Sequence, residues 1–270
     1  MRRRAVQLNW DRPLLRLYVV ADTHVGAEAC DERKIEALAQ RIANDDDALV
    51  VGLGDYIEAI TIGDYRFDPA ELAKPIAPEH LSNPLYCQAL RFCKLWEPTR
   101  GKWACVIMGN HERTALSHVH FDATALIAER MGTKYHGGTD EGGWLQIRLM
   151  QGDKVRYRLA VYMQHGWGGG ALRGGDALKL QRLAKDKDAD IVLMAHCHRP
   201  DAFPEPVEGI DRNGWECTKS VWGVIAFPMI AKHGYIARRG GNAPPAGYAV
   251  VTVERQHDGA PLIGAELKTL

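Results

Sequence analysis

The hydrophobic positions of this chain fall into short apolar runs that stop abruptly at polar residues. Short apolar runs bounded by turn signals predict buried strands. They occupy residues 14–21, 48–53, 103–107 and 191–195, and runs at 217–227, 235–238, 248–254 and 262–267 are interpreted as strands as well. Alternating apolar positions at 144–150 and 155–163 predict a hairpin around residues 151–153.

Helical periodicity separates several of these runs. In residues 31–44, the side chains of Ile35, Leu38 and Ile42 share one face, and Asp31 stands near the positive N-terminal end. Helices are also predicted at residues 85–96, 121–131 and 176–185. The strand–helix–strand order around helix 31–44 favours a parallel sheet with helices on its faces. The whole pattern predicts two stacked sheets flanked by helices, in a single domain over residues 1–270.

Two segments lack a regular pattern, and each leaves two interpretations open. Residues 59–102 are broken by prolines in their first half, so this segment is either a lid or wall of a site or a plain surface excursion. The glycine-dense residues 166–175 are either a flap or a flexible turn with a solvated Arg173. In the flap interpretation, Arg173 meets phosphate and Trp167 stacks on a base.

Composition narrows the class of protein. The 270 residues are 46% hydrophobic and 25% charged, as in ordinary globular proteins. Lys plus Arg and Asp plus Glu are balanced at 34 each, so no global field steers the chain toward nucleic acid or an anionic membrane. The 6 cysteines form no CxxC pair and are interpreted as reduced thiols of a cytoplasmic protein. The longest apolar run, 221–231, is too short to span a bilayer, so no membrane partner is expected.

Polar side chains that can bind metals follow the ends of the apolar runs. Residues at i and i+2 of an extended end point the same way, so Asp22-x-His24 and His196-x-His198 can each aim two side chains at one point. Open α/β sheets bind ligands beyond the carboxyl ends of their strands. The complete set is Asp22, His24, Asp55, Asn110, His111, His165, His196 and His198.

A single histidine in such a position is more often a satisfied core or surface group. The joint pattern favours a metal site, because every one of these groups follows a run that must be buried. Closed zinc sites use about four ligands and often thiolate. The larger set here suits two divalent ions that share a carboxylate and keep positions open for water.

The motifs resemble those of the calcineurin-like metallophosphoesterases, in order and rough spacing, over residues 22–198. The motifs that carry the resemblance are Asp22-x-His24, Gly54-Asp55-x-x-Glu58, Gly109-Asn110-His111-Glu112, His165 and His196-x-His198. The resemblance implies a four-layer α-β-β-α sandwich with two mixed sheets flanked by helices. It also implies one metal on Asp22, His24, Asp55 and His198, and a second on Asn110, His165 and His196, with Asp55 bridging. His111 would face the substrate as a catalytic residue, held by Glu58 or Glu112.

Two departures from the family pattern indicate which branch of the superfamily this chain resembles. Ser/Thr protein phosphatases of this superfamily carry an Arg where this chain has Ala59, and they lack the paired His-x-His ending. Both differences favour the phosphodiesterase and nuclease branch. The implied activity is hydrolysis of phosphate esters, chiefly phosphodiesters of nucleic acid or nucleotides, by a hydroxide between two metal ions. The alternatives are a phosphomonoesterase acting on a small metabolite and a non-catalytic metal-binding scaffold.

The cofactors implied are two divalent metal ions. Mn²⁺ is the first expectation, with Fe, Zn, Co and Ni as alternatives, because affinity order does not decide which metal a cell loads. Arg199, directly after the final ligand, is a candidate phosphate contact, and the alternative is a solvated surface charge. The sequence makes no prediction about the oligomeric state.

Overall fold

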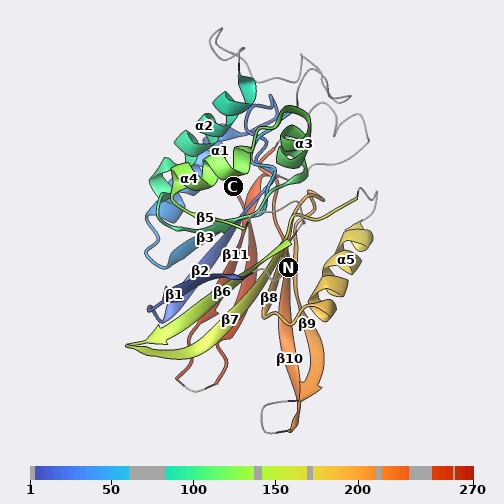
Figure 1. Ribbon diagram of the computed structural model, residues 1–270. Helices are drawn as coiled ribbons and strands as arrows, with labels where there is room; N and C mark the ends of the chain where they lie inside the picture. Colours follow the sequence, from blue (N-terminus) through green and yellow to red (C-terminus); the bar gives the residue numbers. More distant parts are fainter. Residues whose placement is uncertain are drawn as a thin grey trace.

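The computed structural model describes residues 4–60, 83–136, 142–168, 173–210, 214–230, 245–257 and 259–270. Within them, the apolar runs form two six-stranded sheets (Figure 1). The first sheet contains, in spatial order, β12 (Leu262–Thr269), β11 (Gly247–Glu254), β2 (Leu14–Val20), β3 (Ala48–Gly52), β4 (Trp103–Val106) and β5 (Lys134–Tyr135). Strands β2 to β5 are parallel, whereas β11 and β12 are antiparallel to their neighbours.

The second sheet is mixed as well. It contains, in spatial order, β1 (Val6–Trp10), β6 (Gly142–Gln151), β7 (Lys154–Gln164), β8 (Ile191–Met194), β10 (Glu216–Ile225) and β9 (Asp201–Ile210). Strands β6 and β7 form the predicted antiparallel hairpin, and β7, β8 and β10 run parallel. In the first sheet β2 and β3 pair in parallel, as the strand–helix–strand pattern predicted.

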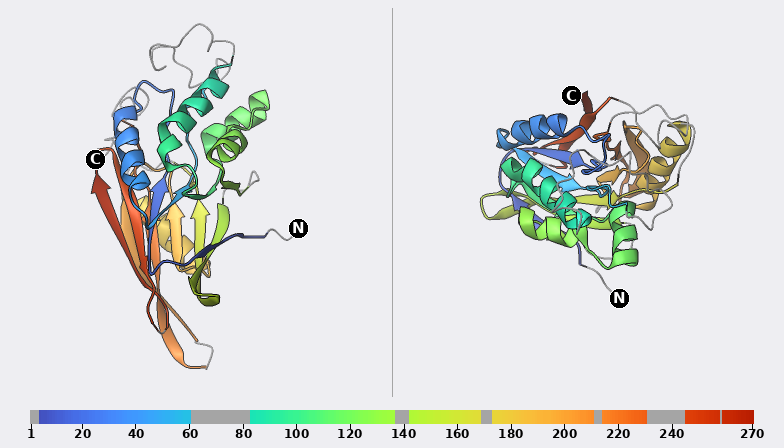
Figure 2. Two further views of the ribbon diagram at one scale, coloured as in Figure 1. Left: turned by 90° about the vertical axis from the view of Figure 1, so that its left-hand side faces the viewer. Right: turned by 90° about the horizontal axis from the view of Figure 1, so that it is seen from above.

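Helices cover both outer faces of the stacked sheets, so the fold has four layers (Figure 2). The helices are α1 (Glu32–Ala43), α2 (Pro84–Trp96), the 3-10 helix η3 (Glu97–Thr99), α3 (Asn110–Val119), α4 (Ala123–Met131) and α5 (Arg173–Asp186). One apolar cluster joins α1, α2 and α4 to the first sheet, a second fills the space between the sheets, and a third joins α5 to β8 and β10. The predicted two mixed sheets flanked by helices are confirmed.

Strand β2 shows how the sequence builds these layers. Its side chains alternate between faces, as every strand requires. Leu15, Leu17 and Val19 enter the cluster between the sheets, whereas Tyr18 and Val20 enter the cluster beneath the helices. A strand buried on both faces reads as a nearly continuous apolar run, and residues 14–21 follow this pattern except at Arg16.

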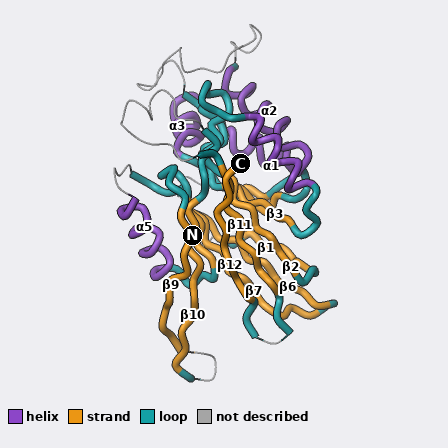
Figure 3. Tube along the Cα trace, turned by 180° about the vertical axis from the view of Figure 1, so that it is seen from behind, coloured by secondary structure: helices purple, strands orange, loops and turns teal. Residues whose placement is uncertain are grey.

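Five elements were absent from the sequence-based expectations: β1, η3, α3, β5 and β9. Helix α3 changes the interpretation of the central motif, because Asn110 and His111 open this helix and do not end a strand. Strands β9 and β10 form a hairpin that extends beyond the other strands (Figure 3). The strand expected at 235–238 and most of the segment between Ile60 and the start of α2 lie outside the described residues. Among the helices described, none is long and apolar enough to cross a membrane.

Candidate metal centre

The loops that leave β2 and β3 are held together by backbone hydrogen bonds. The Asp22 N–H donates to the Gly54 carbonyl at 3.1 Å, and the His24 N–H donates to the Asp55 carbonyl at 3.1 Å. The side chain of Asp22 reaches across to the second sheet, where its Oδ2 accepts from the His196 N–H at 3.0 Å. Loops from both sheets are therefore fixed relative to one another at the carboxyl ends of the strands.

Glycines allow the loops after β3 and β4 to touch. Gly54 has a φ of +93°, and a Cβ atom there would lie 2.3 Å from the backbone nitrogen of Gly109. A Cβ atom on Gly109 would lie 2.2 Å from the backbone nitrogen of Asp55. Only glycine fits at such a close approach. The contact brings the start of α3 against Asp55.

Asp55 lies at the centre of the histidines. Its side chain is 2% exposed, and its Oδ2 lies 3.2 Å from His165 Nε2, 3.9 Å from His24 Nε2 and 4.0 Å from His111 Nε2. Its Oδ1 accepts from the His111 N–H at 2.9 Å. Burial raises the pKa of Asp55, but the charges of His165 and His111 outweigh burial and hold the pKa well below its usual range. A single buried, ionised oxygen thus faces several imidazoles.

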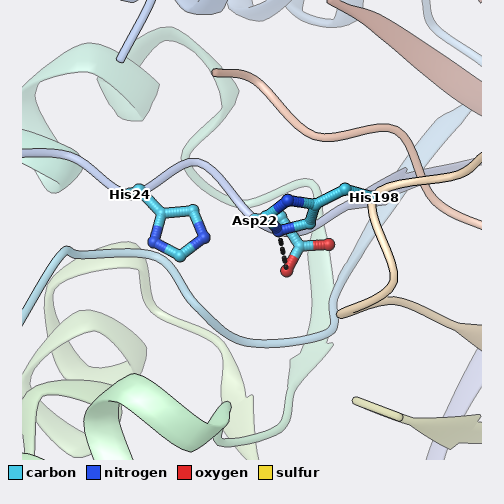
Figure 4. Close-up of side chains that lie close together, drawn as sticks. All are labelled: Asp22, His24 and His198. Carbon is cyan, nitrogen blue, oxygen red and sulfur yellow. Dashed lines mark ion pairs between the residues drawn. The ribbon is translucent and has the colours of Figure 1, made fainter. Parts of the chain in front are cut away.

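Three clusters of possible ligand atoms lie at this centre; His24, Glu58 and His111 form one, and the other two contain the side chains that the resemblance assigns to metals. The ligand atoms of Asp22, His24 and His198 lie within 4.8 Å of one another, and His198 Nε2 pairs with Asp22 Oδ1 at 3.6 Å (Figure 4). The ligand atoms of Asp55, His165 and His196 form the other group, also within 4.8 Å. The structure therefore brings together the side chains that the resemblance divided between two metals.

Asn110 joins the second group through His165. His165 Nδ1 donates to the Leu53 carbonyl at 2.7 Å, which leaves Nε2 facing Asn110 Oδ1 at 2.8 Å and Asp55 Oδ2 at 3.2 Å. Burial lowers the pKa of His165, but Asp55 outweighs burial and raises it to about 9. When His165 is protonated, the proton on Nε2 lies between these two acceptor oxygens. When the imidazole is neutral, a metal cation can take the same position.

Two observations show that this donor set fits divalent metal ions. Among the described residues, Asp22 Oδ1 and His24 Nε2 are buried without a hydrogen-bond partner, which is costly unless a cation binds there. The backbone has a positive φ at several of the candidate ligands, namely Asp22, His24, Asp55, His196 and His198. Non-glycine residues hold this conformation mostly at functional sites, where the surroundings fix it.

Glu58 supports two histidines in different ways. Its carboxylate Oε2 lies 3.0 Å from His24 Nδ1, whereas its backbone carbonyl accepts from His111 Nδ1. Burial lowers the pKa of His24, but the hydrogen bond and charge of Glu58 raise it to about 9. The expectation that the acid of Glu58 holds His111 is therefore corrected: the carboxylate contacts His24, and only the backbone carbonyl of Glu58 contacts the His111 ring.

Glu112 has a role that the sequence-based interpretation did not identify. Its buried carboxylate accepts from the backbone N–H groups of Asp55, Tyr56, Ile57 and Gly109. Burial, followed by the Asp55 charge, raises the pKa of Glu112 to about 7. Glu112 stands three residues after Gly109, and its bond from the Gly109 N–H is the acidic half of a capping box, whose other half a glycine cannot provide. Glu112 fixes the Asp55 loop and does not hold the His111 ring.

The expected substrate contacts lie beside these groups. Trp167, two residues after His165, is 41% exposed, and its carbonyl accepts from Lys179 Nζ at 2.9 Å. Arg199 donates from Nη1 to the buried carboxylate of Asp176. Arg173 opens α5, but its side chain lies outside the described part of the chain.

A comparison with protein-family models identifies the family of this chain. A family model described as calcineurin-like phosphoesterase matches residues 15–200, whereas the curated protein sequences contain no match. The structure is similar to the calcineurin-like phosphoesterase YfkN from Bacillus subtilis, with 10% identity, a TM-score of 0.44 and coverage of 95% of this chain and 90% of that chain. It is also similar to the NAD nucleotidase of Haemophilus influenzae, with 12% identity, a TM-score of 0.43 and coverage of 93% of this chain and 49% of that chain. Because the family match spans more than half of the 270 residues, the chain belongs to the calcineurin-like phosphoesterase family.

Proposed function

We propose that this protein hydrolyses phosphodiesters, of nucleic acid or nucleotides, at a centre that binds two divalent metal ions. The observation that carries the proposal is the position of Asp55. Its buried Oδ2 faces His24 on one side and His165 on the other, at 3.9 and 3.2 Å from their Nε2 atoms. A carboxylate between two groups of ligands is the arrangement that two ions can share.

Each ion has its own set of side chains in this proposal. Asp22, His24 and His198 hold the first, and Asn110, His165 and His196 hold the second, with Asp55 common to both. When bound, such a pair of ions lowers the pKa of coordinated water and neutralises charge on phosphoryl oxygens. We propose Mn²⁺ as the metal, with Fe, Zn, Co and Ni as alternatives.

His111 acts on the substrate side of the centre. Its Nδ1 donates to the Glu58 carbonyl, which fixes the ring and leaves Nε2 directed to the same region as Asp55 Oδ2, 4.0 Å away. The side chain is 12% exposed, so a substrate oxygen can reach it. His111 in its protonated form donates a proton to the leaving alkoxide.

Two features support a diester with a nucleotide portion. The position that carries a phosphate-gripping Arg in Ser/Thr protein phosphatases is Ala59, which is buried and donates its N–H to Gln88. Trp167 presents an exposed indole two residues from His165, where a base can stack. The 6 free thiols support a reducing, cytoplasmic setting for this activity.

Hydrolysis of bis-p-nitrophenyl phosphate, compared with p-nitrophenyl phosphate in the presence of Mn²⁺, tests the proposal. We expect the wild type to prefer the diester. Asp55→Asn should lose at least about 100-fold in kcat/KM, because electrostatic stabilisation of this kind is worth several kcal/mol. Asp46→Asn, on a carboxylate whose side chain is 85% exposed, is the matched control and should retain full activity.

Each alternative has its own result in the same assay. A preference for the monoester would support a phosphomonoesterase in place of a diesterase. Failure of the wild type to hydrolyse either ester, or any of DNA, RNA and cyclic nucleotides, while it binds Mn²⁺ would support the metal-binding scaffold.

A further inference from the structure

A second polar cluster lies beside the metal centre, around the carboxylate of Asp176. This residue stands in the first turn of α5, and its side chain is 1% exposed. Burying a carboxylate is costly unless charged donors pair with it. Lys179 Nζ lies 2.9 Å from Oδ1, and Arg199 donates from Nη1 to Oδ2. Both oxygens of this buried group are therefore used.

The two cations lead to the two loops that carry histidines from the second sheet. Arg199 directly follows His198, so its ion pair ties the His196–His198 loop to α5. Lys179 Nζ also donates to the Trp167 carbonyl at 2.9 Å, which ties the loop after His165 to the same helix. Asp176 is thus connected to both loops through one intermediate each.

These loops need such support because their conformations are strained and tightly packed. His196 and His198 have φ values of 71° and 54°. Gly166 has a φ of +104°, and a Cβ atom there would lie 2.6 Å from the Ala195 carbonyl oxygen. Strained backbone persists only where the surrounding structure over-determines it. The ion pairs of Asp176 lie on the α5 side of these loops and restrict their movement.

We propose that Asp176 is a positioning residue of the metal centre. Through Arg199 it holds the loop of His196 and His198, and through Lys179 it holds the loop that follows His165. The inference rests on the proposed function only in that the centre binds metal. The proposal gives Arg199 a second role besides any contact with phosphate. Through its ion pair with Asp176, Arg199 fixes the positions of His196 and His198 relative to α5.

Binding of Mn²⁺ to the metal-free full chain, measured by isothermal titration calorimetry without substrate, tests this role. Residues that hold metal ligands in place typically affect metal affinity by about 10- to 100-fold. We expect Asp176→Asn, which keeps the side-chain shape but removes its charge, to weaken binding about tenfold. Arg199→Gln should weaken it similarly, and Arg199→Lys, which keeps a cation near Asp176, should recover part of the loss. Asp186→Asn, on an exposed acid of the same helix, should bind as the wild type does.

The double variant Asp176→Asn/Arg199→Gln separates a shared role from two independent ones. Because the two residues act as a pair, the double variant should bind Mn²⁺ about as well as either single variant. Multiplied losses, or wild-type affinity in a folded Asp176→Asn, would overturn the proposal. If circular dichroism shows that Asp176→Asn does not fold, wild-type affinity in Arg199→Gln would overturn it instead. Absence of ester hydrolysis by the wild type overturns the proposed function alone, because these affinities are read without substrate.

Discussion

At the residue scale, Glu58 contacts two histidines through two different groups. The carboxylate hydrogen-bonds His24, a candidate metal ligand, while the backbone carbonyl of the same residue accepts from His111. His111 is therefore oriented by a group that no side-chain substitution removes. The same ring lies 4.6 Å from His24, centroid to centroid, in an edge contact. The position of His111 thus depends on the backbone of the loop after β3.

We expect His111→Ala to retain metal and lose most turnover. His111 lies outside the two groups of side chains that hold the ions in the proposed function, so the Mn²⁺ affinity should stay within about threefold of the wild type. Loss of a general acid typically costs about 100- to 10,000-fold in rate. The measurement is kcat for the diester together with Mn²⁺ titration calorimetry. His118→Ala, an exposed histidine on the same helix, is the control. A metal-loaded, fully active His111→Ala would contradict the role.

The closeness of the candidate ligands is the part of the site that the sequence indicated most clearly. Most of these residues follow an apolar run and lie in a loop after a strand, so polarity alone indicated their places, whereas Asn110 opens α3. The role of Glu112 at the Asp55 loop was not identified, because three of its four backbone donors come from residues 55–57, and contacts between distant loops leave no local signal. The Asp176–Arg199 pair was not identified for the same reason, since the two residues are 23 positions apart.

At the element scale, backbone contact between the loops after β3 and β4 sets the position of α3. Gly54 and Gly109 meet without side chains, which allows the first turn of α3 to place Asn110 and His111 beside Asp55. An added Cβ on Gly54 would meet backbone atoms alone, and one on Gly109 would meet the backbone nitrogen and the Oδ1 atom of Asp55, both at 2.2 Å. Neither loop can shift without moving Asp55.

We expect Gly54→Ala to destabilise the protein by about 2–4 kcal/mol. The left-handed conformation at φ +93° costs about 1 kcal/mol for alanine, and the clash with Gly109 adds the cost of overpacking, about 1–3 kcal/mol. Urea unfolding monitored by circular dichroism measures the change.

Gly101→Ala is the matched control for that experiment. Gly101 has a similar φ of +87°, but a Cβ atom there would meet nothing within 4 Å. It should cost only the conformational penalty of about 1 kcal/mol. Equal losses in the two variants would show that the contact between the loops contributes nothing to stability.

The elements that the sequence did not predict have physical explanations. Strand β9 contains Pro204 and Pro206, which argue against a strand, but β9 lies at the edge of its sheet, where missing donors are tolerated. Strand β1 is short and half-buried, with a weak alternation of Val6, Leu8 and Trp10. Helix α3 buries only Glu112 and Ala115, so its apolar periodicity is faint. Buried strands and helices with wide apolar faces were predicted within a few residues of their observed ends.

At the scale of the whole molecule, the four layers place the site where both sheets end. The first sheet contributes Asp22, His24 and Asp55, and the second contributes the histidines after β7 and β8. A site shared between two packed sheets is held by the core that joins them, and that core is a continuous apolar cluster. The charge state of the site is therefore linked to the stability of the entire fold.

This linkage predicts how metal binding and stability depend on pH. In the metal-free protein the pKa of His24 and of His165 is raised from 6.5 to about 9. The stability that these protonated histidines contribute is present below pH 6.5 and is lost as the pH rises through 9. Mn²⁺ requires neutral imidazole, so each ion displaces about one proton, and its affinity should rise about tenfold per pH unit between 6.5 and 9.

Calorimetry at pH 7 in two buffers of different ionisation enthalpy measures the protons released, and we expect about one for each ion bound. Thermal melts should show the metal-free protein losing stability from pH 6.5 to 9 while the stabilisation by Mn²⁺ grows. Glu58→Gln is the informative variant, because it removes the charge that raises the pKa of His24 and leaves His165 unchanged. It should release about one proton fewer than the wild type. Binding of Mn²⁺ at pH 7 with no proton release would contradict the raised pKa values, and with them the conclusion that protons occupy the positions of the metal ions in the metal-free centre.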